Sequence, residues 1–246
     1  MTRHIWVFGS SGPLGSALAS TLGHEAEVIR FGRSEPEGDS NRVRIDFRDE
    51  EYLRHAVRVN FAEKPPSGIV FAQRYRPLEE ASTLDSVSRG LEVELGPLLT
   101  VTELVKDLGN PGPLKSLVLY SSTAAQSAHL DVPIFYHILK SATLSAVTSL
   151  SPHLGRHDIK INALVLGDFL KYPIKSYSDE EKLKFEKIAD ISIGGRCGSI
   201  SDIVEMTRYL LSEEAGYITG QVINLDGGAG VIALASYIRA FNVWKE

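Results

Sequence analysis

The sequence contains a single cysteine, Cys197, and no long hydrophobic run. One cysteine excludes an intramolecular disulfide, and without Cys or His at ligand spacing it indicates no zinc site, so we expect a cytoplasmic setting and no metal. The N-terminal apolar run at 5–8 is far shorter than a signal-peptide core or the roughly 20 residues of a membrane helix. We therefore expect neither a targeting segment nor a membrane partner.

The charge balance also lacks a basic excess. The 246 residues include 26 Lys and Arg against 31 Asp and Glu, and no basic stripe suited to nucleic-acid phosphates is present. The 43% hydrophobic and 23% charged residues are typical of a globular protein with a sizeable core. This composition disfavours a nucleic-acid partner and excludes disordered and fibrous classes, and the length suits one domain over 1–246.

Short apolar runs alternate with longer segments of helical period, which predicts an α/β fold with a parallel sheet buried on both faces. Strands are expected at 5–8, 27–31, 43–46, 68–72, 114–120, 160–165 and 221–225. Pro13 marks the first position of a helix that ends near Leu22. The segment 167–196 has many charges, a weak helical period and no strand signal, so we expect a mobile excursion that covers a substrate.

A glycine-rich turn spans 9–15 and joins the first strand to the first helix. Its glycines let the backbone approach a phosphate, and the N–H groups and dipole at the helix start favour negative charge. The spacing is G-x-x-G-x-x-G rather than the dinucleotide fingerprint G-x-G-x-x-G. The turn is either a purely structural connection or a cofactor site, for which the candidates are Gly9, Ser11, Gly12, Leu14 and Gly15.

The end of the second strand lacks the acid that hydrogen-bonds the ribose 2′-OH of NAD. Arg33 stands there with Gly32 before it, and a guanidinium suits a 2′-phosphate, which favours NADP(H) over NAD(H). The alternative is that Arg33 is a solvated loop residue. Asp46, at the end of the third strand, either accepts from an adenine amino group or serves as a turn residue or a helix cap.

Tyr136 and Lys140 are four positions apart in a helical segment, so both side chains emerge on one face. A nearby ammonium stabilises a phenolate, which makes Tyr136 a candidate general acid, although this spacing also arises by chance. Ser122 ends the fifth strand, where its hydroxyl either faces the same crevice as the glycine turn or serves only the local turn.

These features, in this order, resemble the short-chain dehydrogenase/reductase family over nearly the whole chain. The likeness is most specific near the C-terminus, in Arg196-Cys197-Gly198-Ser199, Ser201-Asp202-Ile203 and the run Tyr-Ile-Thr-Gly-Gln-Val-Ile-Asn-Leu-Asp-Gly-Gly at 217–228. The family's serine, its Tyr-x-x-x-Lys pair and its nucleotide turn fall on Ser122, on Tyr136 with Lys140, and on 9–15.

The resemblance implies a Rossmann-type doubly wound parallel sheet of about seven strands in a single domain. It also implies hydride transfer between a nicotinamide and a carbonyl or alcohol of a small or medium-sized metabolite. In that scheme Tyr136 protonates the carbonyl oxygen, Ser122 hydrogen-bonds it, and Lys140 holds the nicotinamide ribose. A homodimer or homotetramer is implied as well, and the apolar tail at 229–246 is expected to pack against another subunit.

The chain departs from the family pattern in several places. Val70-Phe71-Ala72-Gln73 replaces Asn-Asn-Ala-Gly after the fourth strand, and Leu166-Gly167 replaces Pro-Gly after the sixth. Glu94 replaces an asparagine that helps tie the catalytic lysine into a water chain. Its carboxylate would accept from Lys140 or from a bridging water, so it joins the catalytic candidates. The remaining cofactor-binding candidates implied by position are Phe47, Ala72, Gln73 and Gly167.

Three functions remain open. The leading one is an NADP(H)-dependent reductase, or the reverse dehydrogenase. A non-catalytic NADP(H)-binding regulator is left open by Gln73 and Glu94, and the glycine spacing alone suggests a sugar-nucleotide epimerase or dehydratase. We interpret Lys171 and Lys175 as solvated charges. The less favoured alternative is that they lie near an anionic substrate.

Overall fold

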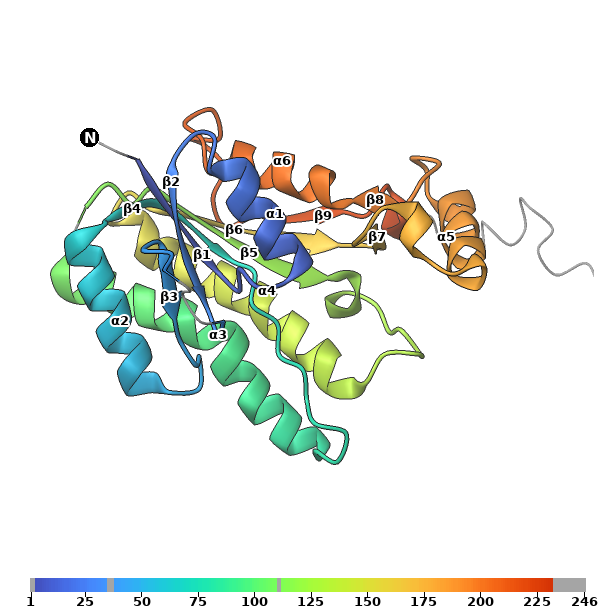
Figure 1. The fold of residues 1–246 in the computed structure, drawn as a ribbon, viewed down its shortest axis with the longest axis horizontal. Helices are drawn as coiled ribbons and strands as arrows, with labels where there is room; N and C mark the ends of the chain where they lie inside the picture. The colour runs from blue at the N-terminus through green and yellow to red at the C-terminus, as the bar shows by residue number, and fades with distance from the viewer. Residues whose placement is uncertain (1–2, 35–37, 110–111, 232–246) are drawn as a thin grey trace, which may run out of the picture.

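The protein is built around one parallel sheet of seven strands, seen in a computed structural model that describes residues 3–34, 38–109 and 112–231 (Figure 1). The spatial order is β3-β2-β1-β4-β5-β6-β9. The strands are β1 (His4–Phe8), β2 (Glu27–Gly32), β3 (Arg42–Arg44), β4 (Pro66–Phe71), β5 (Ser116–Ser122), β6 (Lys160–Leu166) and β9 (Val222–Leu225). All seven predicted strands are confirmed, within a few residues at their ends.

Helices cover both faces of the sheet, as a doubly wound fold requires. One face carries α1 (Pro13–Leu22) and α6 (Ile200–Leu210), and the other carries α2 (Glu50–Glu63), α3 (Thr83–Leu108) and α4 (Ile134–Gly155) (Figure 1). Strand β1 shows why: Ile5 and Val7 join the core under α1 and α6, while Trp6 and Phe8 join the core under α2 to α4. Alternate side chains of one strand thus fill two separate cores.

The helix starts follow capping chemistry. Gly12 is the N-cap of α1 and Pro13 holds its first position, which confirms the predicted start. The N-cap of α2 is Asp49, whose carboxylate accepts from the backbone N–H of Tyr52 at 2.9 Å. The alternative that Asp46 caps this helix is therefore wrong, because Asp46 lies one turn too early and accepts from Arg48 instead.

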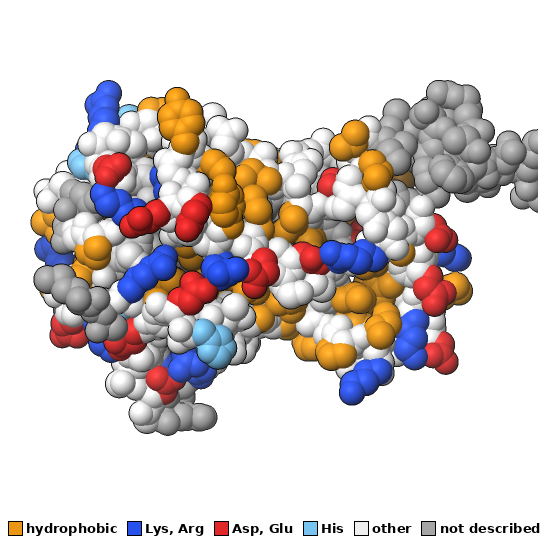
Figure 2. Space-filling view, turned by 90° about the horizontal axis from the view of Figure 1, so that it is seen from above, with side chains coloured by type: hydrophobic (Ala, Val, Ile, Leu, Met, Phe, Trp, Pro, Cys, Tyr) orange, Lys and Arg blue, Asp and Glu red, His pale blue; other side chains and the backbone are white. Residues whose placement is uncertain are grey.

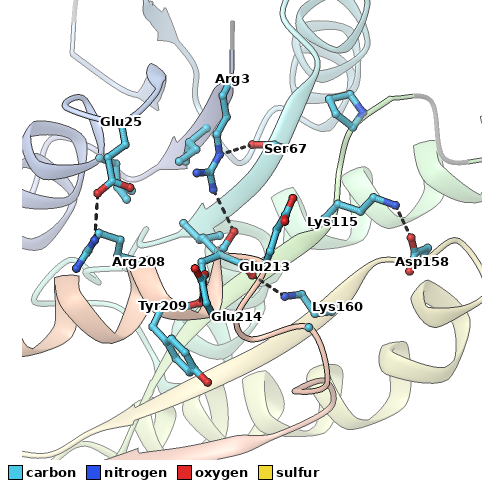
Figure 3. A pocket seen from close by; sticks show the side chains of 16 residues that line it. Arg3, Glu25, Ser67, Lys115, Asp158, Lys160, Arg208, Tyr209, Glu213 and Glu214 are labelled. Carbon is cyan, nitrogen blue, oxygen red and sulfur yellow. Dashed lines mark hydrogen bonds and ion pairs between the residues drawn. The ribbon is translucent and has the colours of Figure 1, made fainter. Parts of the chain in front are cut away.

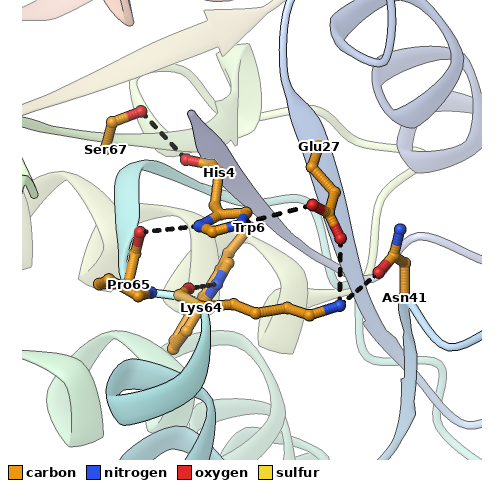
Figure 4. A network of polar contacts seen from close by, with 7 residues as sticks. All are labelled: His4, Trp6, Glu27, Asn41, Lys64, Pro65 and Ser67. Carbon is orange, nitrogen blue, oxygen red and sulfur yellow. Dashed lines mark hydrogen bonds and ion pairs between the residues drawn. The ribbon is translucent and has the colours of Figure 1, made fainter. Parts of the chain in front are cut away.

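At the amino ends of the strands, polar side chains are bonded to one another (Figure 4). The ammonium of Lys64 donates to Glu27 Oε1 at 3.1 Å and to Asn41 Oδ1 at 2.6 Å. The Trp6 indole N–H donates to the Lys64 carbonyl at 3.1 Å, so the same residue joins β1, β2 and the start of β4. The hydrogen bond from Lys64 holds the pKa of Glu27 below its usual value.

A cavity of about 990 Å³ opens near the same amino ends, but its cations are already bonded within the protein (Figure 3). Arg3 donates to the Leu211 carbonyl, and Lys160 donates to the carbonyls of Ser212 and Ala215, each at 3.1 Å. Partial burial lowers the pKa of Lys160. This cavity is therefore a poor candidate for a catalytic site, despite its size.

The excursion after β6 carries more regular structure than the sequence predicts. It contains β7 (Phe169–Leu170), a short 3-10 turn (Ile174–Ser176) and α5 (Asp179–Ile191), and β7 pairs with β8 (Gly198–Ser199) at one end of the molecule (Figure 1). The expectation of no strand there is wrong, since two-residue strands are too short for a period to show. A side chain at Gly198 would meet the Phe169 ring at 2.3 Å, so glycine lets the strands pair.

None of the helices in the described part of the chain is both long and apolar enough to cross a membrane. On the face shown in Figure 2, acidic and basic side chains are interspersed rather than gathered by sign. Most of the predicted oligomerisation tail, residues 232–246, lies outside the described residues.

Candidate active site

The strand register brings the predicted site residues to one edge of the sheet. Phe8 pairs with Phe71, and Ser122 pairs with Leu166, so the ends of β1, β4, β5 and β6 lie side by side. Gly9, Ala72 and Gly167 directly follow three of these strands, and Ser122 ends the fourth. Ligands of open α/β sheets bind at this carboxyl edge.

The three glycines of the turn have different surroundings. A Cβ on Gly9, whose φ is +79°, would lie 2.3 Å from the Gln73 backbone nitrogen, and one on Gly15 would lie 2.3 Å from the Gly9 oxygen. Both positions need glycine because backbone segments meet there. A Cβ on Gly12 would have nothing within 4 Å, so this glycine borders open space at the start of α1. Leu14, by contrast, packs against the core under α1 and α6.

Beside this turn, Arg33 follows the end of β2, and Asp46 and Arg48 follow the end of β3. The Ser11 and Ser34 hydroxyls are 2.9 Å apart, and Arg33 between these segments is exposed. Asp46 accepts from the Arg48 guanidinium at 3.0 and 2.7 Å. This bond, the backbone N–H of Arg48 and the nearby charge of Arg33 hold the pKa of Asp46 below its usual value.

Phe47 and Gly167 take part in packing rather than presenting side chains to a ligand. The Phe47 ring is buried 6.1 Å from that of Phe8, so only its backbone is available at the edge. A Cβ on Gly167 would lie 2.9 Å from the Cα of Asp226, which explains the glycine by the close approach of two chains. The Ala72 N–H is likewise used, since it donates to the Phe8 carbonyl at 2.9 Å.

Tyr136 lies between two cations. Its ring centroid is 5.3 Å from Lys140 Nζ, which confirms that the two side chains share a helix face, and 5.0 Å from Arg74 Cζ. The Ser121 hydroxyl donates to the Lys140 carbonyl at 2.8 Å and so fastens α4 to the end of β5. Ser122, next along, accepts from the Ala124 N–H at 3.3 Å.

Lys140 forms a buried ion pair with Glu94. Its Nζ donates to Glu94 Oε2 at 2.6 Å, and both side chains belong to residues only 6% exposed. The second carboxylate oxygen accepts from the Tyr75 N–H at 3.2 Å, and the Glu94 carbonyl accepts from Gln73 Nε2 at 2.9 Å. The sequence leaves open a direct contact or a bridging water, and the structure has the direct contact.

The residues at this edge fit a nicotinamide dinucleotide. Gly12 borders open space at a helix start, which suits a pyrophosphate, and Arg33 is free of ion pairs within the described ranges. The Gln73 Oε1 atom is buried and has no hydrogen-bond partner among the described residues. A ligand hydroxyl would supply the missing donor.

Three contributors escape the sequence reasoning: Arg74, Tyr75 and Ser121. Arg74 and Tyr75 come shortly after the end of the fourth strand, so their place at a carboxyl edge is the signal that marks them. Ser121 is adjacent to the predicted Ser122, and nothing in the sequence tells which of two neighbouring serines turns inward.

The doubly wound sheet and this edge define a Rossmann-type nucleotide-binding protein. A family model described as enoyl-(acyl carrier protein) reductase matches residues 68–230. The chain therefore belongs to the short-chain dehydrogenase/reductase family.

Individual relatives agree with this placement. The uncharacterised oxidoreductase YmfI of Bacillus subtilis (strain 168) is 35% identical over 95 residues, covering 39% of this chain and 38% of the relative. The 1,6-dihydroxycyclohexa-2,4-diene-1-carboxylate dehydrogenase of Acinetobacter baylyi (strain ATCC 33305 / BD413 / ADP1) is 27% identical over 189 residues, covering 72% and 68%. The matches span 38 to 50% of the length of the first three curated relatives.

Solved structures share the fold. A structure described as ElxO with NADP bound superposes with a TM-score of 0.78 at 19% identity, covering 94% of this chain and 100% of that one. At this identity the likeness shows the fold alone.

Proposed function

We propose that this protein is an NADP(H)-dependent oxidoreductase that reduces a carbonyl group of a small or medium-sized metabolite, or oxidises the corresponding alcohol. One observation carries the proposal: the Tyr136 ring lies 5.3 Å from the Lys140 ammonium at the carboxyl edge of a nucleotide-binding sheet. A homo-oligomer, dimer or tetramer, is part of the proposal through the family resemblance.

The chain's own groups have distinct tasks in this reaction. Tyr136 donates its hydroxyl proton to the carbonyl oxygen, and Ser122 donates a hydrogen bond to the same oxygen. The positive charge of Lys140 favours the phenolate that remains on Tyr136. Glu94 is a positioning residue, because its 2.6 Å bond to Lys140 fixes the ammonium under the tyrosine.

Four groups are suited to hold the cofactor. The turn at Gly12 and the start of α1 would receive the pyrophosphate, Arg33 the 2′-phosphate, and Gln73 Oε1 a ribose hydroxyl. When bound, the reduced nicotinamide supplies the hydride for the carbonyl carbon. The absence of an acid in the segment Phe31-Gly32-Arg33-Ser34 supports the preference for NADP(H) over NAD(H).

A second function, a non-catalytic NADP(H)-binding regulator, has one observation in its favour. The Glu94 carboxylate contacts Lys140 directly and offsets the positive charge that a phenolate needs. In this case the same edge would bind the cofactor, and Tyr136 would keep its proton, because the phenolate would no longer be favoured.

The Tyr136→Phe variant separates the two functions. Purified wild-type and variant proteins are assayed for NADPH oxidation with a panel of aldehydes and ketones, and NADPH binding is measured by fluorescence titration. We expect the variant to bind NADPH like the wild type and to lose about 10²–10⁴-fold in kcat, the usual range for a general acid. Unchanged turnover would reject the tyrosine mechanism. NADPH binding with no turnover in the wild type favours the regulator.

A further inference from the structure

Arg74 lies beside Tyr136, and two further cations, Arg76 in the same segment and Lys171 from a distant part of the sequence, are close enough for the arginine charges to act on the lysine. We define the basic cluster as Arg74, Arg76 and Lys171. The two arginines lie in the segment that follows β4, and the lysine directly follows β7, the short strand after β6. All three residues are exposed at the carboxyl edge. The cluster is formed by the fold, because no sequence motif joins these positions.

Contacts with neighbouring residues place Arg74 and the turn that carries Lys171. The Arg74 guanidinium carbon lies 5.0 Å from the Tyr136 ring centroid. The backbone N–H groups of Lys171 and Tyr172 donate to the Tyr177 hydroxyl at 2.9 and 3.1 Å. The Tyr177 ring packs edge-on against Phe185 of α5 at 4.9 Å. The turn that carries Lys171 is therefore anchored to a helix.

The charges within the cluster repel one another. Loss of solvent around the Lys171 ammonium, with the positive charges of Arg74 and Arg76, holds its pKa below the usual value. Within the described ranges, no carboxylate forms an ion pair with any of the three. Other cations of this chain do find acids, and acids outnumber bases 31 to 26. An unpaired cationic cluster beside a reaction centre is the arrangement expected of an anion site.

We propose that the basic cluster binds a carboxylate or phosphate group of the substrate, so that the enzyme acts on anionic carbonyl compounds. The inference rests on the proposed function, since Arg74 bridges the cluster and the tyrosine assigned as the proton donor. A guanidinium pairs with either anion through two parallel hydrogen bonds. The cofactor phosphates have other groups to bind them, at Gly12 in the turn after β1 and at Arg33 after β2, which lies on the far side of β1 from β4.

Equilibrium binding tests the cluster without relying on turnover. The holoprotein saturated with NADP⁺ is titrated calorimetrically with 4-acetylbenzoate, with its neutral methyl ester, and with 4-acetylphenyl phosphate. We expect at least one anionic probe to bind about tenfold or more tightly than the ester, the size of one charge-assisted hydrogen bond. The carboxylate and phosphate arms identify which anion the site takes. Added salt should weaken the anionic probe and leave the ester unchanged.

Single substitutions show which residues cause the tighter binding of anionic probes. Arg74→Ala and Lys171→Ala should each remove most of it while NADPH binding stays as in the wild type, and Arg74→Lys should retain part of it. Lys175→Ala is the matched control, because it removes an exposed lysine on the same excursion and should change nothing.

The proposal is overturned if the wild type binds no anionic probe more tightly than the ester, or if both alanine variants keep the preference. It is also overturned if these variants weaken NADPH binding instead, which would assign the cluster to the cofactor. If the wild type shows the anion preference but turns over none of the carbonyl compounds, the redox function is rejected and the anion site stands. If a variant fails to fold, the salt dependence of the wild type decides.

Discussion

The two edges of the sheet differ in whether exposed cations are left without a partner in the protein. At the amino edge, cations are paired with acids or bonded to carbonyls, as in Lys64 with Glu27, Arg208 with Glu25, and Lys160 with two carbonyls (Figures 3 and 4). At the carboxyl edge, Lys140 and Arg48 are paired with acids, but Arg33 and Arg74 are exposed and form no ion pair within the described ranges. Charges satisfied inside the protein contribute to the fold, whereas charges left unpaired are available to an anionic ligand.

The buried pair of the carboxyl edge should give the largest effect on stability. Glu94→Ala leaves the buried Lys140 ammonium without its partner, which costs about 3–5 kcal/mol of the free energy of unfolding. Lys115→Ala, which removes an exposed partner of Asp158 at the other edge, should cost far less. Urea unfolding measures both. Equal losses would show that burial does not distinguish these pairs.

The second largest effect should be on the preference for NADPH over NADH. Arg33→Ala removes the proposed partner of the 2′-phosphate, so NADPH should bind about tenfold or more weakly, while NADH binding stays unchanged. Fluorescence titration with both cofactors measures the two dissociation constants. Equal losses for NADPH and NADH would remove the argument from the 2′-phosphate.

The glycine turn allows a sharper division between packing and binding. Gly15→Ala places a Cβ against the Gly9 oxygen and should cost about 1–3 kcal/mol of stability, the usual range for overpacking. Gly12→Ala meets no protein atom and should leave stability nearly unchanged while weakening NADPH binding. Thermal unfolding and NADPH titration of both variants test this, and a reversed pattern would contradict it.

The smallest effect belongs to the amino edge. The pKa of Glu27 is lowered in the folded protein, so its carboxylate stabilises the fold above its unfolded pKa of about 4.3, and this contribution disappears as the pH falls through the folded value. Glu27→Gln should cost less than about 1 kcal/mol at neutral pH, and this difference should vanish in acid. NADPH binding should not change. A difference that grows in acid would have the wrong sign.

The sequence predicts the sheet well because each strand is long enough to show its pattern. Runs such as Ile5 to Phe8 are apolar on both faces and therefore mark central strands. The strands at Phe169 and Gly198 are missed because two residues carry no period.

Some residues of the candidate site can likewise be predicted from the sequence and others cannot. Tyr136 and Lys140 are predicted because one helix fixes their relation. The effect of the Arg74 charge on Lys171 depends on how the excursion after β6 folds, and no local spacing encodes it. The ion pair between Asp46 and Arg48 could not be predicted from the sequence either, because it depends on side-chain geometry.

The most direct test follows the hydride. Wild-type protein is incubated with NADPH that carries deuterium at the transferable C4 position, together with 4-acetylbenzoate and the aldehyde and ketone panel, and the products are examined by NMR. Deuterium on the carbinol carbon of a product, lost in Tyr136→Phe, is the predicted result. Saturated NADPH binding with all deuterium retained on the nicotinamide, for every carbonyl compound, would contradict the assignment of the carboxyl edge to carbonyl reduction.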